Sequence, residues 1–284
     1  MQMDRDQFLS WSNKAVSLLG MSGVGKTTLA NRLPKSDWFH YSADYRIGTK
    51  YLEEPILDNI KRQAMQVGFL RDLLRSDSIY ICSNITVHNL EPLSTFLGKV
   101  GAVQNGGLSV EEFRRRQRLH RNAEIGATRD AVEFIDKGQT LYGYSHFIAD
   151  TSGSICELDD PQTIELLARH SLLIYIAADD EMQAELIRRA VAAPKPLYYQ
   201  EQFFDQHLLR YLDNNNLACA AQMDPDHFVQ WIFPFLVEHR RPRYQWIANR
   251  YGYTVSAADV ASVRDETDFL ELVATALSRS RNAA

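Results

Sequence analysis

The feature that most constrains this chain is a glycine-rich segment near its amino end. Residues 20–27 read Gly-Met-Ser-Gly-Val-Gly-Lys-Thr and match the pattern G-x-x-x-x-G-K-[ST] in full. An apolar run at 15–19 comes directly before it, and residues 27–33 have the composition of a helix that ends at Pro34. A strand, a glycine loop and a helix in this order are typical of a loop that binds phosphate groups.

Each residue type in this motif has a physical reason. Glycines lack a Cβ atom, so the backbone can curl and turn its N–H groups toward an anion, and the following helix adds its positive dipole end. Lys26 would reach the β- and γ-phosphates, and the hydroxyl of Thr27 would ligate Mg²⁺. We therefore expect ATP and Mg²⁺ here, bound by Gly20, Ser22, Gly23, Val24, Gly25, Lys26, Thr27 and Thr28.

Length and charge narrow the class of protein further. The 284 residues correspond to one enlarged domain or to two domains of about 150 residues each. A content of 45% hydrophobic and 24% charged residues excludes a disordered or low-complexity chain. The net charge of −5 provides no basic field, so we expect neither nucleic acid nor a membrane as a partner.

The chain termini and cysteines bear on its location. Residues 1–14 contain no apolar core of a signal peptide, and nowhere do 18 apolar residues follow one another as a membrane span requires. The three cysteines are odd in number and widely spaced, as expected for reduced thiols. We therefore expect a cytoplasmic protein. We further expect it to be a monomer or a homodimer.

Alternating strand and helix patterns predict the fold. Apolar runs predict strands at 15–19, 38–42, 144–149, 171–176 and 251–255, with a further candidate at 79–82. Helical patterns occupy 55–75, 89–98, 109–136, 161–170, 181–191, 201–212, 225–250 and 265–279. This alternation predicts an α/β fold, a P-loop NTPase three-layer sandwich with a mostly parallel sheet. Its core would comprise 1–50 and 141–284, and 51–140 would be a helical insertion that forms a lid or a substrate-binding subdomain.

A phosphate-binding loop of this kind needs an acidic residue at the end of a neighbouring strand to hold Mg²⁺. Asp150 and Asp179 each follow an apolar strand. Asp150 precedes a turn of small residues that lets the backbone approach a phosphate, whereas Asp179 and Asp180 have the pattern of a helix cap with an acidic first turn. We therefore assign Asp150, together with Thr27, to the metal, and Asp179 and Asp180 to the cap.

Asp44 and Arg46 directly follow the second predicted strand, 38–42. Ligands of open parallel sheets bind at the carboxyl ends of the strands. Asp44 could accept a proton from an attacking hydroxyl or lie beside the metal, while Arg46 held an anionic acceptor. The alternative is a turn aspartate followed by a surface arginine.

In the order and spacing of these motifs the chain resembles the small P-loop kinases, of which shikimate kinase and gluconate kinase are examples. The glycine loop, the strand end at Asp44 and residues 148–153 match the first three motif positions of that family. Arg188 and Arg189 resemble its lid, and 243–255 resembles its closing helix and last strand. The likeness covers most of 15–50 and 141–280. The chain is also similar to bacterial proteins that are labelled only as ATPases.

The resemblance implies roles for individual residues. Lys26 and Thr27 would be ligands of phosphate and Mg²⁺, Asp44 a base or a metal-side carboxylate, and Arg188 or Arg189 a lid arginine above the phosphates. Two features depart from the family: the insertion at 51–140, and Thr-Ser-Gly-Ser at 151–154 where those kinases have a glycine triplet.

The insertion carries a stripe of arginines. Arg114, Arg118 and Arg121 are spaced so that they share one face of a helix. Such a stripe either binds an anionic substrate beside the nucleotide or is a solvated face whose charge nearby glutamates balance.

These observations favour a kinase that transfers the γ-phosphoryl group of ATP to an unidentified small-molecule acceptor. Its catalytic residues would be Lys26, Asp44, Arg46, Arg188 and Arg189. The alternative is a regulatory ATPase that hydrolyses ATP to switch a partner or assembly interface, with 172–180 as its Walker B strand. A GTPase ranks third, because the sequence has no N-K-x-D guanine motif.

Overall fold

The computed structural model describes residues 3–281, and its own contacts divide the chain into two compact units. The first unit comprises 1–43, 124–194 and 230–284, and the second comprises 44–123 and 195–229. Two of the four boundaries fall inside long helices, α7 (Val110–Thr140) and α11 (Pro225–Tyr251), so each of these helices contributes to both units. The segment 195–229, which the sequence patterns leave with the core, groups instead with 44–123.

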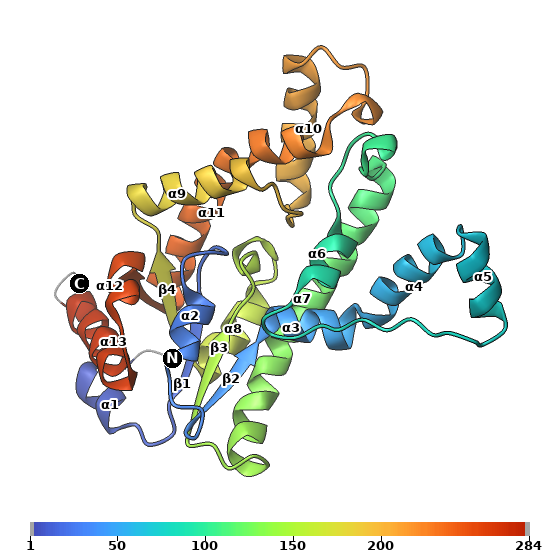
Figure 1. Cartoon of the computed structure of the whole chain (residues 1–284). Coiled ribbons are helices and arrows are strands. Elements are labelled where there is room, and N and C mark those ends of the chain that lie inside the picture. Colours follow the sequence, from blue (N-terminus) through green and yellow to red (C-terminus); the bar gives the residue numbers. More distant parts are fainter. Residues whose placement is uncertain (1–2, 282–284) are drawn as a thin grey trace. The chain divides into compact units, whose positions relative to one another are not determined.

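The first unit is built on one five-stranded sheet in the described part of the chain (Figure 1). Its strands lie in the order β2-β3-β1-β4-β5, and every neighbouring pair is parallel. This confirms the α/β class and the parallel sheet. The strands are β1 (Ala15–Leu19), β2 (Trp38–Ser42), β3 (His146–Asp150), β4 (Leu172–Ala177) and β5 (Gly252–Ser256).

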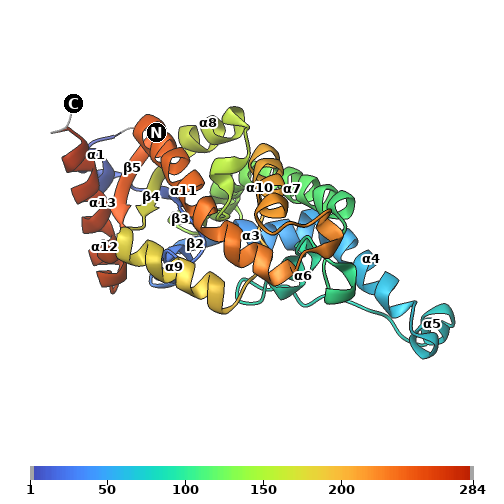
Figure 2. The same cartoon turned by 90° about the horizontal axis from the view of Figure 1, so that it is seen from above.

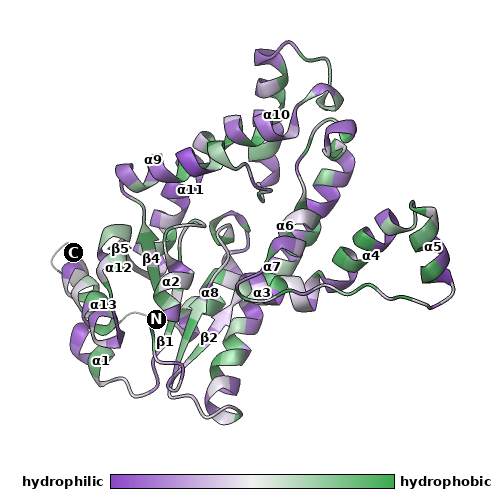
Figure 3. Cartoon of the chain, in the orientation of Figure 1, coloured by the Kyte–Doolittle hydropathy of each residue, from purple (hydrophilic) through white to green (hydrophobic). Residues whose placement is uncertain are grey.

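The central strands are apolar because they are buried on both faces. All five residues of β1 are buried, as are the first five of β4. Continuous apolar runs of this kind are typical of strands inside a parallel sheet that helices cover. Figure 3 shows the same pattern, with a hydrophobic central strand β4 and helices that are hydrophilic on part of their surface.

Helices of the first unit flank this sheet (Figures 1 and 2), an arrangement consistent with a three-layer α/β fold. Helix α2 contacts β3, α8 contacts β4, and α13 contacts β5. The helices are α1 (Arg5–Ser10), α2 (Lys26–Asn31), α8 (Pro161–His170), α9 (Asp180–Ala192), α12 (Ala257–Ser262) and α13 (Glu266–Arg281), with the adjoining parts of α7 and α11 and the short 3₁₀ turn η3 (Ile155–Glu157).

The second unit is helical. Its elements are α3 (Ala43–Arg46), the π-helical turn η1 (Ile47–Tyr51), α4 (Glu53–Ala64), α5 (Gly68–Arg75), α6 (Glu91–Leu97), η2 (Val103–Asn105), α10 (Glu201–Asn214) and η4 (Ala220–Gln222), with the remaining parts of α7 and α11. The prediction of a strand at 79–82 is wrong, because these residues form no strand in the structure. Tyr80 is 85% exposed, and an apolar run becomes a strand only where another strand pairs with it.

The hydropathy of the described helices shows whether any of them could span a membrane. No helix in this part of the chain combines the length and the apolar character that crossing a bilayer requires.

The register of the sheet determines which residues meet at its carboxyl edge. Leu18 of β1 lies opposite Asp150 of β3, and Ser42 of β2 lies opposite the same aspartate from the other side. The segments that follow β1 and β3 therefore leave the sheet next to each other. This is the edge at which open parallel sheets bind their ligands.

At the opposite edge, His146 leads to a prediction about pH. Burial, and then the charge of Lys14, lower the pKa of its imidazole, and its Nδ1 accepts a hydrogen bond of 3.2 Å from the backbone N–H of Lys14. The unfolded chain therefore binds a proton at a pH where the folded chain does not, so the free energy of unfolding falls as the pH drops below about 6.5. We expect His146→Asn to reduce this dependence in urea denaturation. The exposed His170, changed to Asn, serves as the control, and an equal reduction there would contradict the assignment.

Candidate functional site

The glycine loop, residues 20–28, follows β1 and includes the first three residues of α2, and it has the backbone that its composition predicts. Gly20, Gly23 and Gly25 have φ angles of +143°, +93° and +101°, which residues with a side chain rarely adopt. A Cβ atom on Gly20 would also lie 2.9 Å from the carbonyl oxygen of Ile176, and one on Gly23 would lie 2.7 Å from Leu186. The glycines are thus needed for both conformation and close packing.

Lys26 is the first residue of α2, and its side chain folds back over the loop. Its Nζ donates hydrogen bonds to the carbonyl oxygens of Gly20 at 2.8 Å and Met21 at 3.1 Å, and the residue is only 6% exposed. Gly25 is the N-cap of this helix and has no side chain to cap its first N–H groups. The ammonium group is therefore held within the loop by the same backbone that would surround an anion.

Thr27 and Asp150 are in direct contact. The hydroxyl of Thr27 donates a hydrogen bond to Oδ2 of Asp150, the last residue of β3, and the aspartate is 8% exposed. The other acidic candidate has a different role: Asp179 is the N-cap of α9 and accepts a hydrogen bond of 2.8 Å from the backbone N–H of Met182. The capping role predicted for Asp179 is confirmed, and Asp180 lies in the first turn of that helix.

The turn that follows β3 lies directly against the glycine loop. A Cβ atom on Gly153 would lie 2.3 Å from the hydroxyl oxygen and 2.7 Å from the backbone nitrogen of Ser22. Thr151 holds the start of the turn, because its hydroxyl donates a hydrogen bond of 2.7 Å to the carbonyl oxygen of Leu18. The turn and the loop thus form one surface at the carboxyl edge of the sheet.

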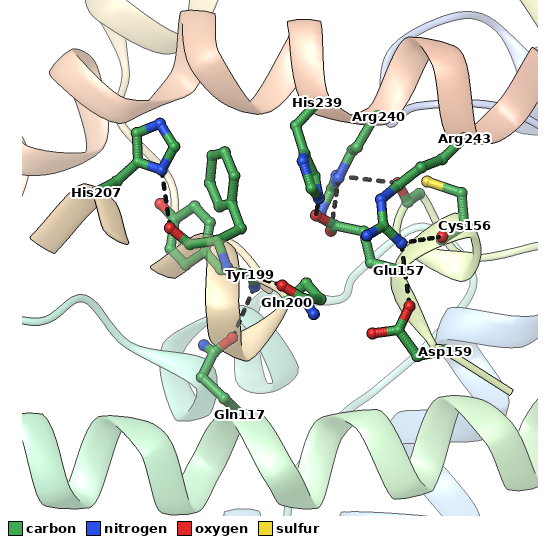
Figure 4. A network of polar contacts seen from close by, with 12 residues as sticks. Gln117, Cys156, Glu157, Asp159, Tyr199, Gln200, His207, His239, Arg240 and Arg243 are labelled. Atoms are coloured by element: carbon green, nitrogen blue, oxygen red, sulfur yellow. Dashed lines mark hydrogen bonds and ion pairs between the residues drawn. The ribbon is translucent and has the colours of Figure 1, made fainter. Parts of the chain in front are cut away.

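Behind this turn lies a buried ion pair (Figure 4). Arg240 of α11 donates from Nε and Nη2 to Oε2 of Glu157 at 2.8 Å and 2.5 Å, and its Nη1 donates to the carbonyl oxygen of Gly153 at 3.0 Å. The two side chains are 4% and 0% exposed. Nε2 of His239 lies 3.6 Å from Oε1 of the same glutamate. Sequence reasoning missed Arg240 and Glu157.

Glu124 and Cys156 are also buried in this part of the first unit. Glu124 of α7 is fully buried, and its Oε2 accepts a hydrogen bond of 2.6 Å from the hydroxyl of Ser154. Burial raises the pKa of the Cys156 thiol well above its ordinary value, so this cysteine is neutral and unreactive at physiological pH. Arg243, three residues further along α11, donates a hydrogen bond of 3.1 Å to Oδ1 of Asp159, which lies beyond residues 151–154 of the turn.

The two predicted lid arginines lie on α9, and their side chains are exposed to solvent. Arg188 and Arg189 are 73% and 60% exposed, and both donate hydrogen bonds to Glu185 on their own helix. Leu186 of the same helix is the residue that contacts Gly23. The helix is therefore next to the glycine loop, while its arginine side chains are bound to a neighbouring glutamate.

Asp44 and Arg46, the predicted acceptor-side residues, lie in the short helix α3, and both are half-buried. Asp44 follows the last residue of β2 by two positions. Both residues belong to the second unit, and their roles toward an acceptor stay predictions.

Residues of the predicted arginine stripe on α7 differ in their surroundings. Arg114 bonds Asp205 at 2.7 Å and Arg118 is exposed, whereas the buried arginine of this helix is Arg116, which sequence reasoning did not select. Arg116 donates to the carbonyl oxygen of Phe96 and to Asn59. Hydrogen bonding by Arg115 lowers the pKa of Glu112, on the same helix, to about 2. These contacts fasten α7 to other helices of the second unit.

A separate polar group fixes the start of α10 within the second unit (Figure 4). Gln117 accepts a hydrogen bond of 2.8 Å from the backbone N–H of Tyr199 and donates to the carbonyl oxygen of Leu197 at 3.2 Å. Gln200 caps α10, and His207 bonds the carbonyl oxygen of Phe203 one turn later. These bonds hold the backbone at 197–200 in place.

No family model matches the chain, and no curated protein matches it.

Among the described residues, no group of three or more His, Cys, Asp or Glu side chains is placed to hold a metal ion by itself.

The contact between Gly153 and Ser22 gives a testable prediction. We expect Gly153→Ala to lower the free energy of unfolding by about 1–3 kcal/mol, because the new Cβ would overlap backbone as well as side-chain atoms of Ser22. Gly138→Ala is the matched control, since its Cβ would meet Phe39 at an ordinary 3.4 Å and alanine favours a helix. Urea denaturation of both variants measures the difference. Equal stability of the two variants would show that the turn and the loop are not closely packed.

Proposed function

We propose that the chain is a P-loop NTPase that uses ATP and Mg²⁺, and that it is a kinase for a small-molecule acceptor. The hydrogen bond between Thr27 and Asp150 is the observation that carries this proposal. It brings the hydroxyl of the motif and a strand-end carboxylate to one point beside a lysine-bearing glycine loop. P-loop NTPases hold Mg²⁺ with the hydroxyl group of the P-loop and with an aspartate from the end of a neighbouring strand.

The donor set fits magnesium. Mg²⁺ prefers oxygen ligands and is usually bound by one or two carboxylates together with substrate phosphates, so it does not need a cluster of three acidic side chains. Thr27 and Asp150 would hold the ion, which supplies positive charge that stabilises the transferring phosphoryl group. The buried position of Asp150 keeps its carboxylate oriented toward Thr27.

The loop itself would bind and orient the phosphates. Lys26 now donates to the carbonyl oxygens of Gly20 and Met21 and can exchange these for phosphate oxygens, which are stronger partners because they are charged. Gly20, Gly23 and Gly25 let the backbone approach the anion. Thr28 and Val24 belong to the same loop, as do the N–H groups of the first turn of α2.

The acceptor would be bound on the side where β2 ends. In this proposal Asp44 takes up the proton of the attacking hydroxyl and Arg46 holds an anionic group of the acceptor. Arg188 or Arg189 would leave Glu185 and contact the transferring phosphoryl group. A lid that excludes water would direct the phosphoryl group to the acceptor and away from hydrolysis.

The capping role of Asp179 supports the kinase over the regulatory ATPase. In the ATPase interpretation the strand at 172–180 would supply the metal-side carboxylate. Asp179 instead accepts the backbone N–H of Met182 and begins α9, and Asp150 is the aspartate that contacts Thr27.

Nucleotide binding tests the proposal directly. We expect Lys26→Ala to weaken ATP binding in the presence of Mg²⁺ by about tenfold or more, since it removes a charge-assisted hydrogen bond to phosphate. The exposed Lys35, changed to Ala, is the control of equal charge change. Isothermal titration calorimetry measures both. Equal affinity of the two variants would argue against a phosphate-binding role for the loop.

A second experiment separates kinase from ATPase. We expect the protein to hydrolyse ATP slowly on its own and to transfer the γ-phosphoryl group of labelled ATP to one component of a pooled metabolite mixture. Asp44→Asn should abolish this transfer, because an amide cannot accept the proton, while ATP binding is retained. Rapid hydrolysis that no added metabolite changes would favour the regulatory ATPase instead.

A further inference from the structure

The turn after β3 is fixed at three successive places. Thr151 bonds the carbonyl oxygen of Leu18, Gly153 accepts a hydrogen bond of 3.0 Å from Arg240, and Ser154 bonds Glu124. The last two contacts come from helices α11 and α7. The turn therefore contacts the glycine loop and is also bonded by two buried side chains, Arg240 and Glu124.

Arg240 makes the central one of these contacts. Nε and Nη2 of Arg240 each donate to Glu157, and Nη1 donates to the carbonyl oxygen of Gly153, whose α-carbon packs on Ser22. The peptide of Gly153 thus lies between the guanidinium group and the glycine loop. A displacement of Arg240 would therefore displace the peptide of Gly153, and Gly153 follows Asp150 by three residues.

The energetics of this pair point to a positioning role. Buried ion pairs seldom add stability, because desolvation of the two charges offsets their attraction, and an apolar pair of similar volume is often as stable. Arg240 and Glu157 are nevertheless both buried. A planar guanidinium offers what an apolar side chain lacks, namely several N–H donors in a fixed geometry that hold two acceptors at once.

We propose that Arg240 is a positioning residue for the metal: through the carbonyl group of Gly153 it fixes the turn that directly follows Asp150, and so sets the affinity for Mg²⁺ of the nucleotide-bound protein. This inference rests on the proposed binding of ATP and Mg²⁺ and extends it to a residue that contacts neither. Residues that orient metal ligands from behind change metal affinity by about 10- to 100-fold when they are removed.

The experiment uses the full chain and a fluorescent ATP analogue, titrated first in EDTA and then with increasing MgCl₂. The test variant is Arg240→Met with Glu157→Met, which removes both buried charges together and leaves neither of them unpaired. We expect its affinity for the analogue in EDTA to match that of the parent, because the glycine loop is intact. We expect the Mg²⁺ concentration at half-maximal effect to rise by about tenfold or more.

Two further variants separate positioning from stability. Arg240→Lys keeps the charge beside Glu157 but lacks the fork that reaches Gly153 as well, so it should fold and still raise the Mg²⁺ midpoint. Arg243→Met removes an arginine three residues further along α11, whose partners are Asp159 and the carbonyl oxygen of Cys156, and should leave the midpoint unchanged. Thermal denaturation of each variant shows that it is folded.

The outcomes are distinct. A folded double variant and a folded Arg240→Lys that both have the parent's Mg²⁺ midpoint would overturn the positioning role and leave nucleotide binding untouched. An equal rise of the midpoint in Arg243→Met would overturn it as well, because the effect would then be general to the helix. A parent protein that binds no analogue in either condition would refute the proposed function, and this inference with it.

Discussion

The contact between Thr27 and Asp150 depends on the order of the strands. Because β3 lies directly beside β1, and Leu18 is in register with Asp150, the loop after one strand and the turn after the other leave the sheet at the same place. The two segments are 123 residues apart in the chain. They can meet so closely because Gly153 has no side chain where it touches Ser22. The arrangement of the sheet thus creates the candidate site, and the glycines make it compact.

Sequence reasoning recovered the parts of this site that local patterns encode. The glycine loop has a fixed spacing, and strands β1 and β4 are apolar along nearly their whole length, so both are readable without a partner. Asp150 could be distinguished from Asp179 because a helix cap has its own local pattern. The α/β class and the parallel sheet followed from the alternation of such segments.

What could not be predicted depends on contacts between distant segments. Arg240 and Glu157 are 83 residues apart, and neither stands in a motif that marks it as buried. Residues 79–82 have the composition of a strand but no neighbouring strand to pair with in the described structure. Helix α11 continues through Pro234 and Pro242, because the packing of its buried residues outweighs a local preference that would end a helix.

The arginines of the first unit show how burial separates two kinds of role. Arg188 and Arg189 bond Glu185 at the surface, where ion pairs contribute little because water competes for both partners. Such arginines can exchange their glutamate for a phosphate with little loss, so their present position is compatible with the lid hypothesis. Arg240 cannot exchange partners in this way, because its departure would remove both hydrogen bonds that it donates to Oε2 of Glu157 while that carboxylate stays buried. A mobile role suits the exposed pair, and a fixed role is the one that suits Arg240.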